Sequence, residues 1–106
     1  LLHFHIGSQL SSILPFKKTL AEAAHFYTEL AAECPSLEFF DVGGGLGVDY
    51  DGSKTVNDSS MNYTIEEYAR DIVYIVGDIC RQKKVHPPVL ISESGRALVA
   101  HHSVLI

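Results

Sequence analysis

The segment Leu-Glu-Phe-Phe-Asp-Val-Gly-Gly-Gly-Leu-Gly occupies residues 37–47 and sets the fold class that the sequence predicts. Its first six residues are rich in aromatic and β-branched side chains, which favour a short β-strand over residues 37–42. The glycines that follow let backbone N–H groups converge on an anion without obstruction by Cβ atoms. A tight turn imposed by close packing is the alternative interpretation. The segment therefore predicts a strand that ends in a candidate anion-binding turn.

A strand is also predicted over residues 1–6, at the start of the chain. Leu2, Phe4 and Ile6 alternate with His3 and His5, so that one face of this strand is apolar and the other carries imidazoles.

A helix is expected between these two strands. It runs from about Pro15, which suits a first-turn position, to residue 33, and Pro35 prevents its continuation. Apolar residues repeat at helical spacing along it, namely Phe16, Leu20, Ala23, Ala24, Tyr27, Leu30 and Ala31.

A long polar loop over residues 48–62 follows the glycines, and a second helix then opens with a capping box formed by Thr64 and Glu67. A third strand is predicted over residues 89–91, and the tail from residue 97 begins a further element. The buried stripe expected for the second helix comprises Ile65, Tyr68, Ile72, Ile75, Val76 and Ile79.

The resulting order, β-α-β-α-β, predicts parallel strands joined by right-handed crossovers. Two architectures fit this order, a doubly wound open sheet and an arc of a (β/α)₈ TIM barrel. Three strands cannot close a barrel of roughly 250 residues, so the barrel interpretation makes residues 1–106 a fragment.

Composition excludes some partners. The chain carries a net charge of −5 without a clustered basic patch, which argues against nucleic acid and anionic membranes. No apolar run approaches the ~20 residues that span a bilayer, and no signal peptide is recognisable, so a cytoplasmic location is expected. Cys34 and Cys80 lack metal-binding spacing and are expected to be buried free thiols.

All three predicted strands end in polar or glycine-rich motifs, which places these motifs at one edge of the sheet. The motifs are His-x-Gly-Ser at 5–8, the glycine run, and Glu-x-Gly-Arg at 93–96. Ligands bind at this edge in parallel α/β folds. The glycine run is neither a Walker A loop nor a dinucleotide fingerprint, because no Gly-Lys-Ser/Thr follows and Val48 replaces the last glycine. The hydroxyl of Ser8 and the guanidinium of Arg96 are candidate ligands of the same anion.

Two alternatives of other classes remain open at this stage. His3 and His5 have a spacing found in metal-dependent hydrolase barrels, and Asp41 or Glu93 could complete a ligand set. The chain could also be a non-catalytic phosphate-binding module. Because no further isolated metal ligand follows another strand, we predict no metal site.

Residues 1–9, 41–52 and 92–106 together resemble the biosynthetic arginine decarboxylases of bacteria and plants, which belong to the alanine-racemase-like pyridoxal phosphate (PLP) enzymes. The shorter motifs are also similar to those of ornithine and diaminopimelate decarboxylases. The resemblance implies decarboxylation of L-arginine to agmatine and CO₂ in the biosynthesis of polyamines such as putrescine and spermidine. The alternative that it implies is a related decarboxylase that acts on ornithine or diaminopimelate.

The resemblance also implies roles for individual residues. His5 would stack on the PLP ring and Glu93 would pair with its pyridine nitrogen, which makes these two the catalytic candidates. The phosphate would be bound by Ser8, by the backbone of the glycines, and by Gly95 and Arg96. The glycines concerned are Gly43, Gly44 and Gly45.

The same resemblance implies that some parts of the enzyme are not supplied by these 106 residues. The Schiff-base lysine, the N-terminal part of the barrel and a C-terminal β domain would lie outside the fragment, which alone is expected to be inactive. The parent would be a homo-oligomer with its active site at a dimer interface. Mg²⁺ is a second cofactor implied by the resemblance alone, and a plastid is the expected location if the source is a plant.

Overall fold

The computed structural model describes residues 1–104 and 106. Three parallel strands form one sheet in the order β1-β2-β3, with Leu2 opposite Phe40 and Phe40 opposite Leu90. The elements in chain order are β1 (Leu2–His3), α1 (Ile13–Glu33), β2 (Phe39–Asp41), α2 (Ile65–Lys83), β3 (Val89–Ile91), α3 (Gly95–Val99) and the 3₁₀ helix η1 (Ala100–His102).

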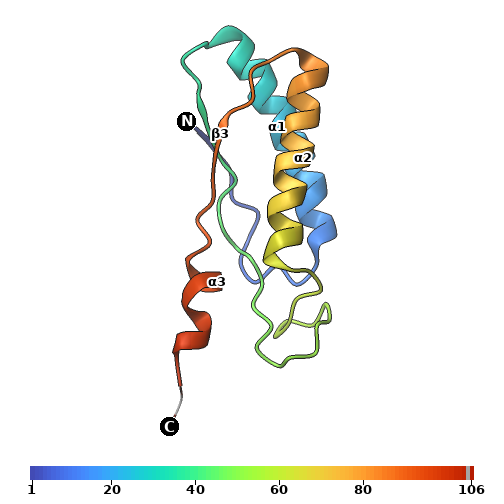
Figure 1. The fold of residues 1–106 in the computed structure, drawn as a ribbon, viewed down its shortest axis with the longest axis vertical. Coiled ribbons are helices and arrows are strands. Elements are labelled where there is room, and N and C mark those ends of the chain that lie inside the picture. Colours follow the sequence, from blue (N-terminus) through green and yellow to red (C-terminus); the bar gives the residue numbers. More distant parts are fainter. Residues whose placement is uncertain (105) are drawn as a thin grey trace.

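Helices α1 and α2 pack against each other on the same side of the sheet (Figure 1). A two-layer arrangement of this kind is what an arc of a (β/α)₈ barrel presents, because a barrel carries its helices on the outer face of the sheet. The predicted β-α-β-α-β order is confirmed.

The core lies between the sheet and the two helices. Phe40 is fully buried in β2, and its ring lies 5.5 Å from that of Tyr27 in α1 and 5.8 Å from that of Phe4. The buried stripes of the two helices meet there, as the helical spacing predicts. The buried helical residues are Phe16, Leu20, Ala24, Tyr27 and Thr28 in α1, and Tyr68, Ile72, Val76, Ile79 and Cys80 in α2.

Several predicted boundaries and burials are wrong. The first strand covers Leu2–His3 only, because the chain turns away beyond Phe4 to pair Leu10 with Leu46. The second strand is likewise shorter, Phe39–Asp41, although backbone hydrogen bonds continue from Val42 to Ile91. Helix α1 starts at Ile13, where Ser12 accepts a hydrogen bond from Leu14 N, so that Pro15 still lies in its first turn.

Three further residues differ from expectation in burial. Leu30 has an exposed fraction of 45% and lies one helical turn after Phe26, which is also exposed. Ile65 has an exposed fraction of 47% and is the first residue of α2. Cys34 is exposed because it follows the last residue of α1, whereas Cys80 is buried as predicted. Among the described residues, no helix is both long and apolar enough to cross a membrane.

Candidate functional site

A pocket of about 200 Å³ lies at the carboxyl ends of the strands, where the sequence predicts a ligand site. Residues that follow all three strands line it. They are His5, Ser8, Gly45, Leu46, Glu93, Ser94, Arg96 and Ala97.

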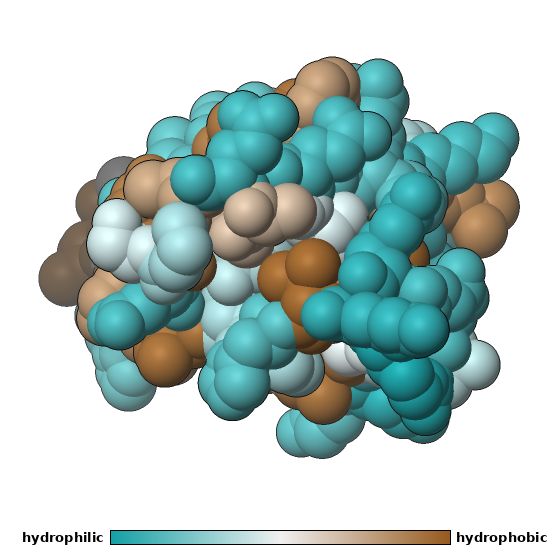
Figure 2. Space-filling model, turned by 90° about the horizontal axis from the view of Figure 1, so that it is seen from above, coloured by the Kyte–Doolittle hydropathy of each residue, from teal (hydrophilic) through white to brown (hydrophobic). Residues whose placement is uncertain are grey.

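A larger hollow of about 650 Å³ lies at the opposite end, beside Tyr27, Leu37 and Lys83. Viewed from the end where α1 and α2 finish, the surface is mostly hydrophilic, with hydrophobic residues scattered over it (Figure 2). This hollow lies at the amino ends of the strands, where parallel sheets do not usually bind ligands. The smaller pocket is therefore the candidate site.

At the glycine run the backbone lies in close contact with the segments that follow β1 and β3. Gly43 and Gly45 have φ values of 69° and 87°, which favour glycine over other residues. A Cβ atom on Gly43 would collide with the carbonyl oxygen of Phe4, one on Gly44 with that of Glu93, and one on Gly45 with that of Gly7. Close packing, the alternative interpretation of these glycines, is thus confirmed as one reason for them.

The backbone amides of the run have different partners. Gly43 N donates to Asp41 Oδ1 at 2.8 Å, so this N–H is engaged within the chain, and the predicted contact of Gly43 with a phosphate stays a prediction. The amides of Gly44, Gly45 and Leu46 donate to no acceptor among residues 1–104. Gly45 and Leu46 also line the pocket. Two of the three predicted donors, the amides of Gly44 and Gly45, therefore have no acceptor among the described residues, and Leu46 offers a further amide.

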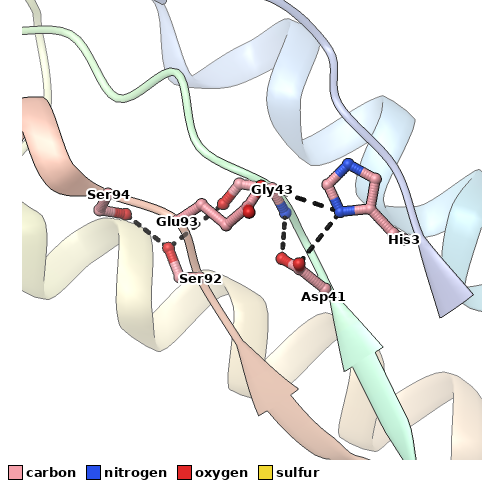
Figure 3. A network of polar contacts seen from close by, with 6 residues as sticks. All are labelled: His3, Asp41, Gly43, Ser92, Glu93 and Ser94. Atoms are coloured by element: carbon pink, nitrogen blue, oxygen red, sulfur yellow. Dashed lines mark hydrogen bonds and ion pairs between the residues drawn. The ribbon is translucent and has the colours of Figure 1, made fainter. Parts of the chain in front are cut away.

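A polar network lies beside the pocket (Figure 3). Asp41 is buried, and its second oxygen, Oδ2, lies 3.0 Å from His3 Nδ1, which is 3.9 Å from Glu93 Oε2. Ser92 Oγ donates to Gly43 O at 3.4 Å. Asp41 thus connects the end of β1 to the glycine turn, and His3 lies between the two carboxylates.

The metal-site alternative is not supported in the form that the sequence suggests. Ligand atoms of His3, Asp41 and Glu93 lie within 4.8 Å of one another, but His5 is absent from this group and lines the pocket instead. In a continuous strand, His3 and His5 would lie on the same face. Strand β1 ends at His3, however, and His5 does not take part in the network. The ion-pair contact with His3 Nδ1 and the hydrogen bond that Gly43 N donates account for the position of the Asp41 carboxylate without a cation.

Of residues 93–96, three line the pocket and one does not. Glu93, Ser94 and Arg96 line the pocket, and the exposed Arg96 forms no ion pair within the described part of the chain. Gly95 begins α3 and is not among the residues that line the pocket, and its predicted contact with a phosphate stays a prediction.

Sequence reasoning missed two residues near the site, Gln9 and Tyr63. The Gln9 carboxamide binds the backbone of Val48, and the Tyr63 hydroxyl binds the backbone of Gly47 and Leu10. The position of Gln9 directly after His-x-Gly-Ser is a signal that could have found it. Tyr63 ends a polar loop and carries no comparable signal.

Residues that offer backbone amides, a hydroxyl, a guanidinium and a carboxylate share one pocket at the carboxyl ends of parallel strands, which is the edge where α/β proteins bind ligands. The chain belongs to the pyridoxal-dependent decarboxylases, since residues 2–100 match the family described as "Pyridoxal-dependent decarboxylase, pyridoxal binding domain".

Curated relatives match the whole chain. It is 57% identical to the biosynthetic arginine decarboxylase of Deinococcus radiodurans and 54% identical to that of Rhodopirellula baltica, each over 106 residues. The chain spans 16% of the length of each of these relatives.

Solved structures of decarboxylases are similar to this chain. The biosynthetic arginine decarboxylase SpeA from Campylobacter jejuni superposes with a TM-score of 0.81 at 46% identity, over 91% of this chain and 16% of that one. Diaminopimelate decarboxylase from M. jannaschii, in complex with L-lysine, gives a TM-score of 0.68 at 35% identity, over 91% of this chain and 20% of that one. The predicted fold class, an arc of the PLP-binding barrel, is confirmed.

Proposed function

We propose that this chain forms the part of an arginine decarboxylase that binds the phosphate and the ring of PLP. The complete enzyme would convert L-arginine to agmatine and CO₂. The observation that carries the proposal is the pocket at the strand ends, where anion-binding groups and Glu93 lie together. The names of the curated relatives favour arginine among the substrates of this family.

The donor set fits a phosphate. One small pocket is lined by Ser8, Gly45, Leu46 and Arg96, which together offer a hydroxyl, two backbone amides and a guanidinium. Backbone N–H groups and a guanidinium fork are the donors that proteins commonly offer to phosphate oxygens. In this proposal Gly43 acts differently, because its N–H fixes the turn through Asp41 and leaves the phosphate to the next residues.

Glu93 and His5 would contact the cofactor ring. A carboxylate beside a pyridine nitrogen favours its protonated form through opposite-charge stabilisation. When bound, PLP supplies an electron sink for the electron pair left after CO₂ departs. Glu93 would keep that sink effective by holding the proton on the ring nitrogen, and His5, stacked on the face of the ring, would fix its plane.

Other functional groups would have to come from elsewhere. None of the lysines lines the pocket, so we propose that the lysine bound to PLP belongs to another part of the polypeptide. The lysines of this chain are Lys17, Lys18, Lys54, Lys83 and Lys84. We also propose that residues 1–106 are a fragment of the barrel domain, and that a second subunit completes the site in a cytoplasmic homo-oligomer.

Mg²⁺ has no clear place in this proposal. The one described group of three metal-ligating side chains includes the imidazole of His3, whereas Mg²⁺ prefers oxygen ligands and water. We assign no step to Mg²⁺, and the requirement stays a prediction from the resemblance.

A substrate comparison tests the function. The complete natural polypeptide that contains these residues would be reduced with borohydride and searched by mass spectrometry for a PLP–lysine adduct. CO₂ release would then be measured from L-arginine, L-ornithine and diaminopimelate. We expect the adduct and a preference for arginine; an enzyme without the adduct would refute the PLP proposal, and a preference for another substrate would refute arginine.

The variant Glu93→Gln tests the role of the carboxylate in the same assay. We expect turnover to fall by about 10²-fold or more, because the charge that stabilises the ring proton is removed while the shape of the side chain is kept. Glu22→Gln, an exposed change on α1, is the matched control and should leave turnover unchanged. Equal turnover in the two variants would contradict this role.

A further inference from the structure

We propose that Gln9 and Tyr63 are positioning residues for phosphate recognition. They hold two loops, residues 7–10 after β1 and residues 43–48 after β2, at the separation at which Ser8 and the amides of Gly45 and Leu46 face one anion. This inference rests on the proposed PLP function. It says that the preference of the site for a phosphate depends partly on two residues that do not line the pocket.

Gln9 connects the two loops through its side chain. Its Nε2 donates to Val48 O at 2.9 Å, and its Oε1 accepts from Val48 N at 3.1 Å. The carboxamide thus satisfies both backbone groups of Val48, as a neighbouring strand would. Gln9 Nε2 also lies 3.4 Å from Ser60 O, to which it donates. The same side chain therefore anchors the long loop that follows the glycines.

The backbone of Gln9 agrees with this role. Its φ of 52° lies in the left-handed region, which residues with side chains adopt at a cost and keep only where surrounding contacts require it. Here the conformation turns the chain so that Leu10 N donates to Gly45 O at 2.9 Å. The strained residue thus lies where the two pocket loops meet.

Tyr63 joins the same loops from the other side. Its hydroxyl donates to Leu10 O at 2.7 Å and accepts from Gly47 N at 2.9 Å. Tyr63 is buried, and this burial raises the pKa of its hydroxyl, so that the group remains a donor through the neutral range. One hydroxyl therefore bridges the backbones of both loops.

Neither residue lines the pocket, so their effect on a ligand must pass through the loops that they hold. Loss of either would let the Ser8 hydroxyl and the amides of Gly45 and Leu46 separate. Recognition of the phosphate should weaken, whereas contacts of His5 and Glu93 with the ring should change less. This difference separates a positioning role from a general loss of stability.

The test measures phosphate selectivity. Tyr63→Phe and Gln9→Met would be made in the complete natural polypeptide, freed of cofactor, and the Kd would be determined for PLP and for pyridoxal, which lacks the phosphate. We expect each variant to lower the preference for PLP over pyridoxal by about tenfold or more, the size of one well-placed hydrogen bond to a charged group.

Tyr27→Phe is the matched control. It also removes one buried tyrosine hydroxyl that donates to a backbone carbonyl, Leu37 O at 3.1 Å, but at the opposite end of the sheet. Its PLP preference should equal that of the wild type even where its Tm falls.

The outcomes are distinguishable. Variants that keep the wild-type preference, or that lose no more of it than Tyr27→Phe, would overturn the inference alone. A wild type that binds PLP and pyridoxal equally would overturn the proposed function. If Tyr63→Phe does not fold, Gln9→Met still decides, because it leaves the Tyr63 hydroxyl in place.

Discussion

Gly45 illustrates how single residues define this site. Its φ of 87° and the carbonyl of Gly7, which occupies the space of a Cβ atom, each exclude other residues at this position. Its N–H has no acceptor within residues 1–104, and the residue lines the pocket. Because glycine has no side chain, Gly45 lets the strand ends pack closely and also leaves a backbone amide available to an anion.

Gly45→Ala is expected to lower the free energy of unfolding by about 1–3 kcal/mol, because alanine is strained at this φ and its Cβ would displace the loop after β1. Urea unfolding measures this change. Gly77→Ala is the control, since nothing lies within 4 Å of its Cβ position in α2, and we expect it to stabilise by about 0.5–1 kcal/mol. A Gly45→Ala variant as stable as Gly77→Ala would contradict the packing argument.

Helix α2 shows how an element is specified at both ends and along one side. The predicted capping box is present, with Thr64 Oγ1 accepting from Glu67 N and Glu67 Oε2 accepting from Thr64 N. Lys84 ends the helix in the left-handed conformation, and Arg81 and Lys83 place positive charge in the last turn. In the core of this helix, the buried Tyr68 hydroxyl forms no hydrogen bond of ordinary geometry in the described structure, although the side chains of Ser92 and Ser94 lie near enough to lower its pKa against the larger effect of burial.

Tyr68→Phe should leave the free energy of unfolding unchanged or raise it by up to about 1 kcal/mol, since a buried hydroxyl without a partner costs free energy in the folded state. Thermal and urea unfolding check this. Tyr27→Phe, which breaks a hydrogen bond to Leu37 O, should instead destabilise by about 1 kcal/mol. Destabilisation by Tyr68→Phe of the same size as by Tyr27→Phe would show that Tyr68 has a partner in solution.

At the scale of the whole molecule, a single layer of helices covers one side of the sheet (Figure 1). Three buried tyrosines and one cysteine, namely Tyr27, Tyr63, Tyr68 and Cys80, belong to one core. Burial is the largest cause that raises the pKa of Tyr27, Tyr63, Tyr68 and Cys80 above the ordinary values of 10.0 and 9.0. These groups lose their protons more readily in the unfolded chain than in the folded one.

The protein should therefore lose stability on the alkaline side. The contribution of these groups is fully present below about pH 9, and it decreases as the pH rises through the raised pKa values of the folded state. We expect the Tm to fall progressively above about pH 9, and tyrosinate absorbance to appear at higher pH in the folded protein than in urea. Identical titration curves in the folded and urea-unfolded states would contradict this prediction.

The sequence by itself determined the order of the elements and the edge on which the site lies. Alternation in the first strand, helical spacing, the Thr64–Glu67 capping box and the motifs after each strand depend on residues close together in the chain. These local patterns also carry the family resemblance, which the match over residues 2–100 confirms.

The tertiary structure alone decided which groups meet. It showed that Gly43 N is bound to Asp41, that His3 and not His5 joins the carboxylates, and that Gln9 and Tyr63 connect the pocket loops. Gln9 and Val48 are 39 residues apart, and Tyr63 and Leu10 are 53 apart. Periodicity and spacing report on neighbours along the chain, whereas such hydrogen bonds form only when folding brings distant backbone and side-chain groups within reach.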